Sequence, residues 1–351
     1  MASDPNIQGN SHAAALRSVG VGNRNDNPAQ WAPFTWDDPH FGPQVKGEVA
    51  PVAFDHTSGS LQLGFWRTAK GIPGCNEDGS CHVDYSAPLG DETMVILEGT
   101  ATVTVTATGK RYRLEAGTII SHPKGVALSW DIDSPFLKKF WILWDSPAPS
   151  VKDDDGYVGH NSDNPEAWEP FTWDEPDHGS MVCGELFKLR STGSTGTLLC
   201  GLWRASVGIA GCAPDGSTAI PYTSPLGDEI ELLLEGAYRV VNEDTGETHN
   251  LRGGDVLAMP RGTRLSWSSK GPFAKKFWLI ANQACRNDGA PGGRSDLALQ
   301  SVCPKRSHCR DRAMSGSRAA CPARYCTPAN KGRCLKPAHI IWHHQSVRKR
   351  L

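Results

Sequence analysis

The pentapeptide PLGDE occurs twice, at residues 88–92 and 225–229, and it places a carboxyl group directly before an apolar stretch ending in Leu-Glu-Gly. Glutamate is a frequent general acid or base when its surroundings raise its pKa toward neutrality. Glu92 and Glu229 are therefore the first candidates for catalysis. The competing interpretation is structural: each Glu binds backbone groups or pairs with a basic residue (Arg67/Arg204 or Lys139/Lys276).

The elements around the two glutamates repeat as well. Residues 31–141 align with 168–278 at a constant offset of 137 without a gap, and about 48 of the 111 positions are identical. The repeat length suits a complete small domain rather than a solenoid unit, so it predicts an internal duplication. We expect a flexible lead over 1–30, domains over 31–147 and 168–283, and an acidic linker over 148–167.

Each copy has the pattern of β-structure. The stretch VILEGTATVTVTA alternates bulky with small or polar residues, as a half-buried strand does, and FWILW and FWLIA resemble buried closing strands. Glycine and proline turns separate these short stretches, for example in HPKG and MPRG. The spacing predicts an all-β fold in which each copy forms a sandwich or barrel.

The order of the motifs resembles the cupin superfamily, most closely the ureidoglycine aminohydrolase and ethanolamine-utilisation type. The first cupin motif ends in Glu-x₆-Gly, which matches Glu92 to Gly99 and Glu229 to Gly236. The second reads Gly-x₅-Pro-x-Gly-x₂-His, and residues 117–125 and 254–262 match it up to the last letter. The resemblance implies two tandem jelly-roll β-barrels, each with a ligand pocket.

Metal-binding cupins hold their metal with a His-x-His pair, the motif Glu and the final His, a donor set suited to Mn, Fe, Ni or Zn. Residues 85–88 and 222–225 stand at the first two histidine positions without a histidine, and Leu128 and Leu265 stand at the last. No cofactor is therefore expected. A divalent metal on unusual ligands such as His82 or His122 stays open as an alternative.

If the barrel is correct, the period of two places Glu, Leu and Trp on inward faces, where burial would raise the pKa of each glutamate. The predicted catalytic set is Glu92, Glu229, Tyr85 and Tyr222. The predicted substrate-binding set is Arg67, Arg204, Trp130, Trp267, Leu128 and Leu265. The alternatives are structural hydroxyls for the tyrosines and surface ion pairs for the arginines. Cys75 and Cys212 are interpreted as ordinary thiols, since no histidine is matched in both copies to activate them.

Charge and composition exclude other classes of protein. From position 284 onward 14 Lys/Arg face 3 Asp/Glu, so the rest of the chain is acidic, with a net charge of about −13. An acidic body is a poor nucleic-acid binder. No apolar run is long enough to span a bilayer, and the first twenty residues lack the pattern of a secretory signal. We expect a cytoplasmic protein, and a small molecule or a second copy of the chain as its partner.

The segment 284–351 differs in composition from everything before it, being basic and carrying six cysteines without periodicity. Its cysteine spacings match no standard zinc knuckle, so a disordered tail is predicted. A second hypothesis is that the segment is an error of the gene model.

We interpret the chain as a bicupin enzyme of small-molecule metabolism, biosynthetic or catabolic, that uses a pocket Glu as acid/base without a metal. An isomerase, cyclase, lyase or hydrolase fits this description. A non-catalytic bicupin that binds a small molecule is the alternative, and a dioxygenase with unusual metal ligands is the third hypothesis.

Overall fold

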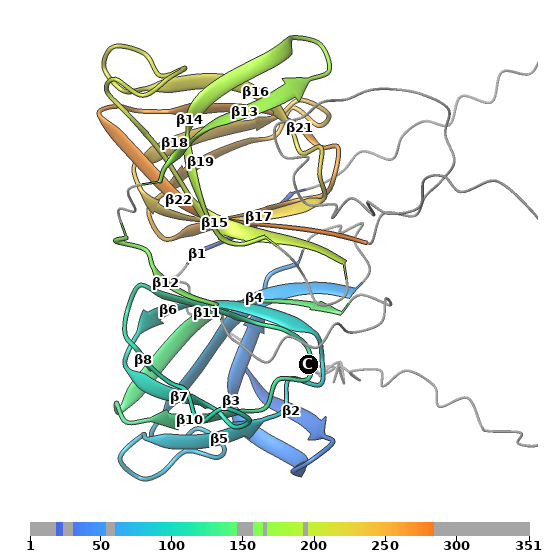
Figure 1. Ribbon diagram of the computed structural model, residues 1–351, viewed down its shortest axis with the longest axis vertical. Coiled ribbons are helices and arrows are strands. Elements are labelled where there is room, and N and C mark those ends of the chain that lie inside the picture. The colour runs from blue at the N-terminus through green and yellow to red at the C-terminus, as the bar shows by residue number, and fades with distance from the viewer. Residues whose placement is uncertain are drawn as a thin grey trace, which may run out of the picture. The chain divides into compact units, whose positions relative to one another are not determined.

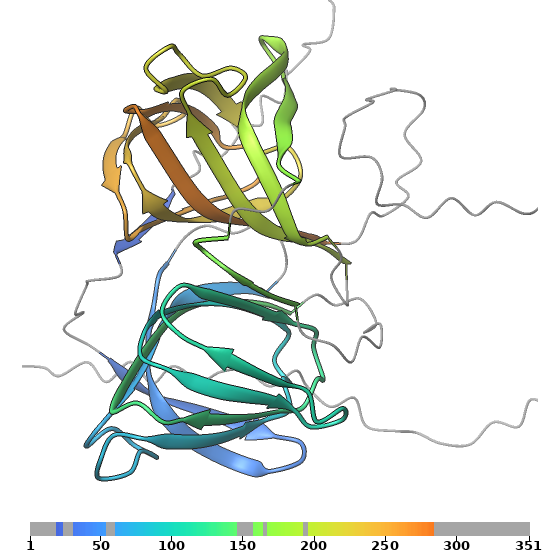
Figure 2. The same ribbon diagram turned by 60° about the vertical axis from the view of Figure 1, so that its left-hand side comes forward.

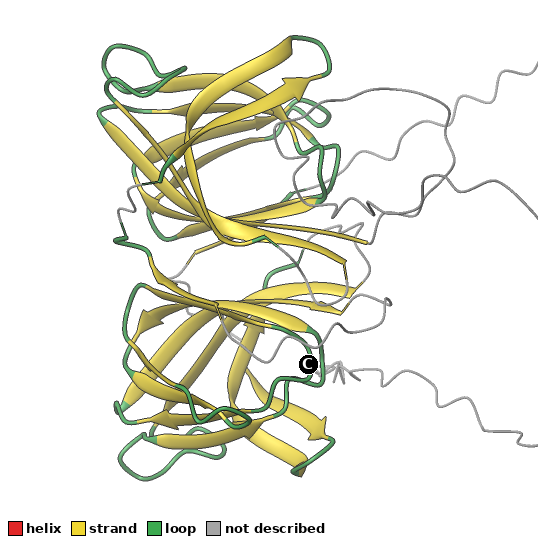
Figure 3. Ribbon diagram, viewed as in Figure 1, coloured by secondary structure: helices red, strands yellow, loops and turns green. Residues whose placement is uncertain are grey.

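The computed structural model describes residues 19–23, 31–53, 60–145, 157–163, 167–191 and 196–283. Every regular element in these ranges is a β-strand, as Figure 3 shows in yellow. The strands of each copy curl into a barrel, seen from two sides in Figures 1 and 2. The predicted all-β fold with two tandem jelly-roll barrels is confirmed. The predicted tail over 284–351 lies outside the described residues.

Each barrel consists of a seven-stranded and a four-stranded antiparallel sheet. In the first barrel the seven-stranded order is β12-β9-β6-β11-β4-β3-β2 and the four-stranded order is β5-β10-β7-β8. Its strands are β2 (Ala32–Asp38), β3 (Gly42–Pro51), β4 (Ser60–Ala69), β5 (Cys81–Tyr85), β6 (Asp91–Glu98), β7 (Ala101–Val105), β8 (Arg111–Leu114), β9 (Thr118–His122), β10 (Leu128–Ile132), β11 (Phe136–Asp145) and β12 (Tyr157–His160).

The second barrel repeats this topology, with the orders β1-β20-β17-β22-β15-β14-β13 and β16-β21-β18-β19. Its strands are β1 (Gly20–Asn23), β13 (Glu169–Glu175), β14 (Gly179–Arg190), β15 (Gly196–Ser206), β16 (Thr218–Thr223), β17 (Asp228–Glu235), β18 (Ala237–Asn242), β19 (Thr248–Arg252), β20 (Asp255–Met259), β21 (Arg264–Ser269) and β22 (Phe273–Gln283).

One edge strand of each barrel comes from outside the repeat assigned to it. β1 precedes the first repeat but pairs with β20 of the second barrel, and β12 follows the first repeat and pairs with β9. Both strands lie where the sequence predicts a lead and a linker. They are only four residues long, GVGN and YVGH, among turn-forming residues, so neither gives a clear alternating pattern.

The interiors of the two barrels are separate hydrophobic clusters, and a third cluster takes residues from both barrels. That third cluster includes Phe65 and Phe140 of the first barrel and Leu202 and Phe277 of the second. The alternation along each seven-stranded sheet therefore sends one set of side chains inward and the other set to the shared cluster. In the described residues, no helix is long and apolar enough to cross a membrane.

The aspartate of each PLGDE copy has a structural role. Asp91 accepts a hydrogen bond from the backbone N–H of Lys124 at 2.8 Å, and Asp228 accepts one from Arg261 at 2.8 Å. These contacts join the PLGDE turn to the Pro-x-Gly turn that follows the next strand of the same sheet. Both turns are thereby fixed at the end of the strand that carries the glutamate.

Candidate functional site

Each barrel encloses a small cavity, of about 40 Å³ in the first barrel and about 50 Å³ in the second. Both volumes are far below the roughly 300–1,000 Å³ of pockets for drug-sized ligands, so only a small molecule fits. Eight lining positions match at the offset of 137: Phe34/Phe171, Trp36/Trp173, Trp66/Trp203, Val83/Ile220, Tyr85/Tyr222, Glu92/Glu229, Trp130/Trp267 and Lys139/Lys276.

A lysine lies between two indole rings in each cavity. The Lys139 ammonium is 4.9 Å from the ring centre of Trp66 and 4.7 Å from that of Trp130. Lys276 is 5.0 Å from Trp203 and 4.4 Å from Trp267. Such cation–π contacts attract an ammonium group to the faces of the two rings.

A glycine bulge makes room for the first of these indoles. Gly47 has φ of +73°, and a Cβ there would lie 2.6 Å or less from ring atoms of Trp66. The Trp66 indole N–H donates to the carbonyl of Lys46 at 3.1 Å. The GE dipeptide of each repeat therefore lets a tryptophan lie flat over the backbone, and Gly184 has the same role under Trp203.

In the first cavity, Glu92 lies between two basic side chains. Its carboxyl oxygens are 3.6 Å from Lys139 Nζ and 3.7 Å from His122 Nε2. Burial lowers the pKa of Lys139 and of His122, whereas the pKa of Tyr85 is raised, first by burial and then by the charge of Glu92. The Lys139 ammonium also lies 2.8 Å from the sulfur of Met94.

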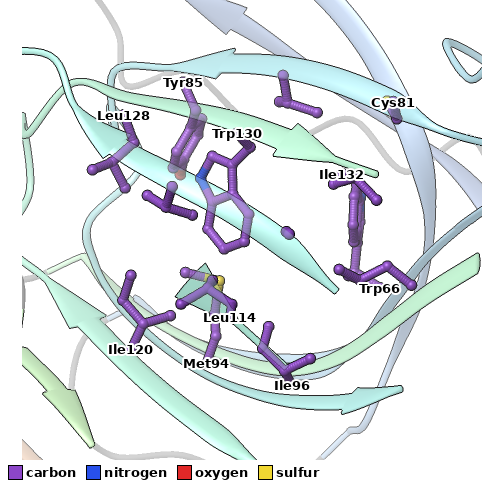
Figure 4. Close-up of a cluster of buried hydrophobic side chains, with 14 of the residues drawn as sticks. Trp66, Cys81, Tyr85, Met94, Ile96, Leu114, Ile120, Leu128, Trp130 and Ile132 are labelled. Carbon is purple, nitrogen blue, oxygen red and sulfur yellow. The ribbon is translucent and has the colours of Figure 1, made fainter. Parts of the chain in front are cut away.

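Figure 4 shows the walls of this first interior. Tyr85 and Trp130, from the four-stranded sheet, lie on one side, and Met94 and Ile120, from the seven-stranded sheet, face them. The predicted inward faces of these strands are thus found in a common hydrophobic cluster.

In the second cavity the corresponding lysine, Lys276, binds an acid at a different position. Position 94 is Met in the first barrel, and its counterpart is Glu231, which is fully buried and forms an ion pair with Lys276. Glu229 instead accepts a hydrogen bond from the Tyr222 hydroxyl at 2.5 Å, with Ser224 Oγ at 3.4 Å.

Burial and the exchange of partners both affect the protonation of Glu229. The pKa of Glu229 is raised to about 8, first by burial and then by the charge of Glu231, while Lys276 and the hydrogen bond from Tyr222 act in the opposite direction. Glu229 therefore holds its proton at neutral pH. A neutral carboxylic acid with a hydroxyl partner is equipped to donate a proton and then to take one back.

The two predicted arginines do not line either cavity. Arg67 donates to Glu48 at 2.9 Å and lies over the Trp31 ring, 4.2 Å from its centre. Arg204 binds Glu185 and Trp168 in the same way. Each arginine joins neighbouring strands at the edge of a seven-stranded sheet, because strands β3/β4 and β14/β15 place the pair opposite each other.

Leu128 and Leu265 also contribute to packing rather than to a cavity wall. Each is 1 % exposed and lies in the hydrophobic cluster of its barrel. The remaining predicted residues, Glu92, Glu229, Tyr85, Tyr222, Trp130 and Trp267, are brought together around the two cavities.

Sequence reasoning did not assign Lys139, Lys276 or Glu231 to the functional site. The lysines were considered only as structural partners of the glutamates. The sequence does contain a signal for Glu231. Among the strand residues that share a face with the motif glutamate, the two repeats differ in polarity at one position, which is Met94 in the first repeat and Glu231 in the second. The carboxylate predicts that the two cavities differ in charge.

The side chains at the metal position do not fit the metal that cupin folds hold. Near Glu92 the nitrogen donors are His122 and a lysine, and near Glu229 a second carboxylate is already paired with Lys276. In the described part of the chain, no group of three or more His, Cys, Asp or Glu side chains is arranged to hold a metal ion. His82, the other histidine considered, is exposed and lies between Asp84 and Asp131.

Comparison with known proteins agrees with the fold. The family model of the EutQ-like cupin domain matches residues 76–141 and 201–277. No curated protein matches the chain in sequence. The chain is similar to the crystal structure of a protein of unknown function from Pseudomonas syringae pv. tomato str. DC3000, of the DUF861 family, with a TM-score of 0.52 and 17% identity over 76% of this chain and 100% of that chain.

Two further solved structures are similar at lower identity. A putative glyoxylate induced protein from Pseudomonas aeruginosa has a TM-score of 0.51 and 10% identity, over 82% of this chain and 96% of that chain. HEPD from Streptomyces albus, solved with 2-hydroxyethylphosphonate and Fe(II) bound, has a TM-score of 0.50 and 8% identity, over 79% of both chains. At these identities the likeness concerns the fold alone.

Proposed function

Because this chain is a bicupin with two EutQ-like cupin domains, we propose that it is an enzyme that performs acid/base chemistry on a small metabolite in its second barrel. Glu229 is the acid/base residue of this proposal, and Tyr222 orients it. The cavity walls supply flat apolar surfaces from Trp203 and Trp267, against which a small unsaturated or ring-shaped molecule would pack.

One observation carries the proposal: Glu229 lines a cavity and has a pKa of about 8. A general acid is most effective when its pKa lies near the working pH, so that both protonation states are available. A strongly perturbed carboxyl group in a cavity is a candidate for a functional site. The hydrogen bond from Tyr222 fixes the direction of the acid.

The single acid favours a reaction that needs no second substrate. Glu229 donates its proton to the metabolite, and the resulting carboxylate then removes a proton from another atom of the same molecule. An isomerase, a cyclase or a lyase uses the proton in this way. A hydrolase would also need a place for water beside the substrate, and the small apolar cavity favours it less.

We propose that the reaction does not use a metal. The groups beside the motif glutamates are a lysine and a single histidine in the first barrel, and the Tyr222 hydroxyl and an already paired carboxylate in the second. For the first barrel we propose ligand binding without catalysis. There Lys139 forms an ion pair with Glu92, and no second carboxyl group shares this lysine as Glu231 does in the second barrel.

The cellular setting is proposed on chemical grounds. Five cysteines among the described residues are free thiols, which agrees with the reducing conditions of the cytoplasm. The partners we expect are a small-molecule substrate and a second copy of the chain, and the acidic body gives no reason to expect nucleic acid.

The test is to incubate the purified protein with a metabolite extract and to follow all small molecules by mass spectrometry. Wild type is expected to consume one metabolite, and Glu229→Gln to lose this activity by about 100-fold or more, the usual range for a removed acid/base. Glu92→Gln is the matched control, which should retain it. Equal turnover by Glu229→Gln and wild type would refute the assignment, and loss of turnover in a chelator would refute metal independence.

A further inference from the structure

Each barrel brings two thiols into contact, and the proposed function uses none of them. In the first barrel Cys75 packs against the hydrophobic cluster that contains Cys81, and in the second Cys212 packs against the cluster that contains Cys183. Each half-buried thiol is near enough to affect the pKa of its buried partner. All four are free thiols, with Cys75 and Cys212 half-buried and their partners buried. A disulfide requires the backbone to bring two cysteines close together.

A tight turn holds the first pair together. Cys75 and Cys81 flank residues 76–80, and the backbone N–H of Asn76 donates to the carbonyl of Ser80 at 2.8 Å, which closes this turn. The sulfur of Cys81 lies 3.3 Å from the carbonyl oxygen of Gly74, the residue before Cys75. The two cysteines therefore face each other across the base of the turn.

A close backbone approach holds the second pair together. The loop after β15 lies against β14, where the N–H of Gly184 donates to the carbonyl of Ala210 at 3.0 Å. A Cβ on Gly211 would lie only 2.7 Å from the Cα of Cys183. Cys212 follows this glycine directly and packs against the cluster that contains Cys183.

The repeat shows that the two pairs are built differently. Cys75 and Cys212 occupy the same position at the offset of 137, but their partners do not. Thr218 stands where the first barrel has Cys81, and Lys46 stands where the second has Cys183. The loop cysteine therefore has the same position in both repeats, whereas the buried cysteine beside it lies on β5 in the first barrel and on β14 in the second.

The environments assign different roles to the two members of a pair. Burial raises the pKa of Cys81 and of Cys183 to about 12, so these thiols are poor first nucleophiles. The half-buried loop cysteines have access to solvent and therefore to small oxidants.

We propose that Cys75–Cys81 and Cys183–Cys212 are two modification sites, each oxidised to a disulfide by a peroxide and restored by a thiol reductant. The sulfur of the loop cysteine attacks one peroxide oxygen, the O–O bond breaks, and the leaving hydroxide takes up the thiol proton as water. The buried sulfur then attacks the sulfur of the resulting sulfenic acid, so that the S–S bond forms and the S–O bond breaks. The leaving hydroxide takes up the proton of the buried thiol and becomes a second water. Two thiols are oxidised and one peroxide is reduced to two waters.

The test treats the full-length protein with hydrogen peroxide, blocks remaining thiols by alkylation under denaturing conditions, and maps the peptides without reduction. Trypsin separates Cys183 from Cys212, whereas Cys75 and Cys81 need cleavage at Glu77 or Asp78 between them. We expect both cross-linked peptide pairs after peroxide and their loss after dithiothreitol. Cys200 is the internal control. It is fully buried, so peroxide should not oxidise it, and it should be found alkylated in every sample.

Two variants separate the sites. Cys81→Thr introduces the residue that the second barrel has at this position and should remove only the first cross-link, leaving Cys75 oxidised beyond the sulfenic acid. Cys183→Ala should remove only the second. The proposal is overturned if peroxide leaves all four thiols open to alkylation, if Cys75 and Cys212 are oxidised while their partners stay reduced in wild type, or if either loop cysteine pairs with a cysteine of 284–351.

Discussion

The two barrels have the same cavity wall and different charges inside it. Both place a motif glutamate, a tyrosine and a lysine held between two indoles around the cavity. The first has one buried carboxyl group for this lysine, whereas the second has two, because Met94 is replaced by Glu231. With one cation for two carboxyl groups, one of them is best kept neutral by a proton.

The difference around the two glutamates arises at two positions, where Glu231 stands in place of Met94 and Met259 in place of His122. Adding a buried acid beside Lys276 removes the lysine from Glu229, and the displaced glutamate turns to the Tyr222 hydroxyl. The cavity walls need not change. In the first barrel the corresponding lysine remains with Glu92, 3.6 Å from its carboxyl group.

The largest expected effect is on stability, when the lysine of the second barrel is removed. Lys276→Met leaves the fully buried Glu231 without its cation, which should cost about 3–5 kcal/mol of unfolding free energy in urea denaturation. Lys139→Met should cost less, because His122 lies 3.7 Å from Glu92 and Glu92 is 7 % exposed.

The double variant Lys276→Met, Glu231→Met is the control for this experiment. It removes the cation together with the acid that needs it and restores the methionine of the first barrel, so most of the stability should return. If the double variant is as unstable as Lys276→Met alone, the loss comes from packing of the lysine between the indoles and not from an unpaired charge.

The second prediction converts one cavity into the other. Glu231→Met should allow Lys276 to turn to Glu229, as Lys139 does to Glu92, and lower the pKa of Glu229 by about 1–3 units. The measurement is a pH titration of ¹³C-labelled glutamate carboxyl groups by NMR, with the Glu229 signal assigned by its loss in Glu229→Gln. An unchanged pKa would mean that burial alone sets it.

The repeated fold and part of the cavity wall were predictable from the sequence. The constant offset gave the duplication, the period of two placed Glu92 and Trp130 on inward faces, and the cupin resemblance placed Tyr85 at a ligand position. The partner of each glutamate was not predictable, because it depends on which of two side chains reaches the lysine. The arginines were predicted to bind substrate because guanidinium groups bind anions. In the structure they bind Glu48 and Glu185 on the neighbouring strands. The sequence of a single strand does not show which residues of another strand lie opposite it.

The third prediction concerns the pH dependence of stability. The pKa of Glu229 is raised to about 8 in the folded protein from 4.5, so between these values the folded state holds one more proton than the unfolded state. This contribution is complete below pH 4.5 and is lost as the pH rises to about 8, with a slope of at most about 1.4 kcal/mol per pH unit. The groups that face Glu229 are Tyr222, Glu231, Tyr238 and Lys276.

The measurement compares urea denaturation of wild type and Glu229→Gln from pH 4.5 to 9. The difference between the two proteins isolates Glu229, since other titrating groups such as His122 contribute equally to both. We expect the wild type to lose stability relative to the variant across this window. A flat difference, or one that grows in favour of the wild type with rising pH, would contradict a protonated Glu229.

The smallest effect is expected for the hydrogen bond between Tyr222 and Glu229. The hydroxyl donates to the carboxyl group and lowers the pKa of Glu229, opposing burial, so Tyr222→Phe should raise that pKa further, by up to about one unit. Tyr85→Phe, the matched change in the first barrel, should leave the Glu229 titration unchanged. The direction of the change decides between two explanations. A lower pKa of Glu229 in Tyr222→Phe would mean that water had entered the cavity in place of the hydroxyl. Exclusion of water, more than the charge of Glu231, would then be what keeps Glu229 protonated in the second barrel.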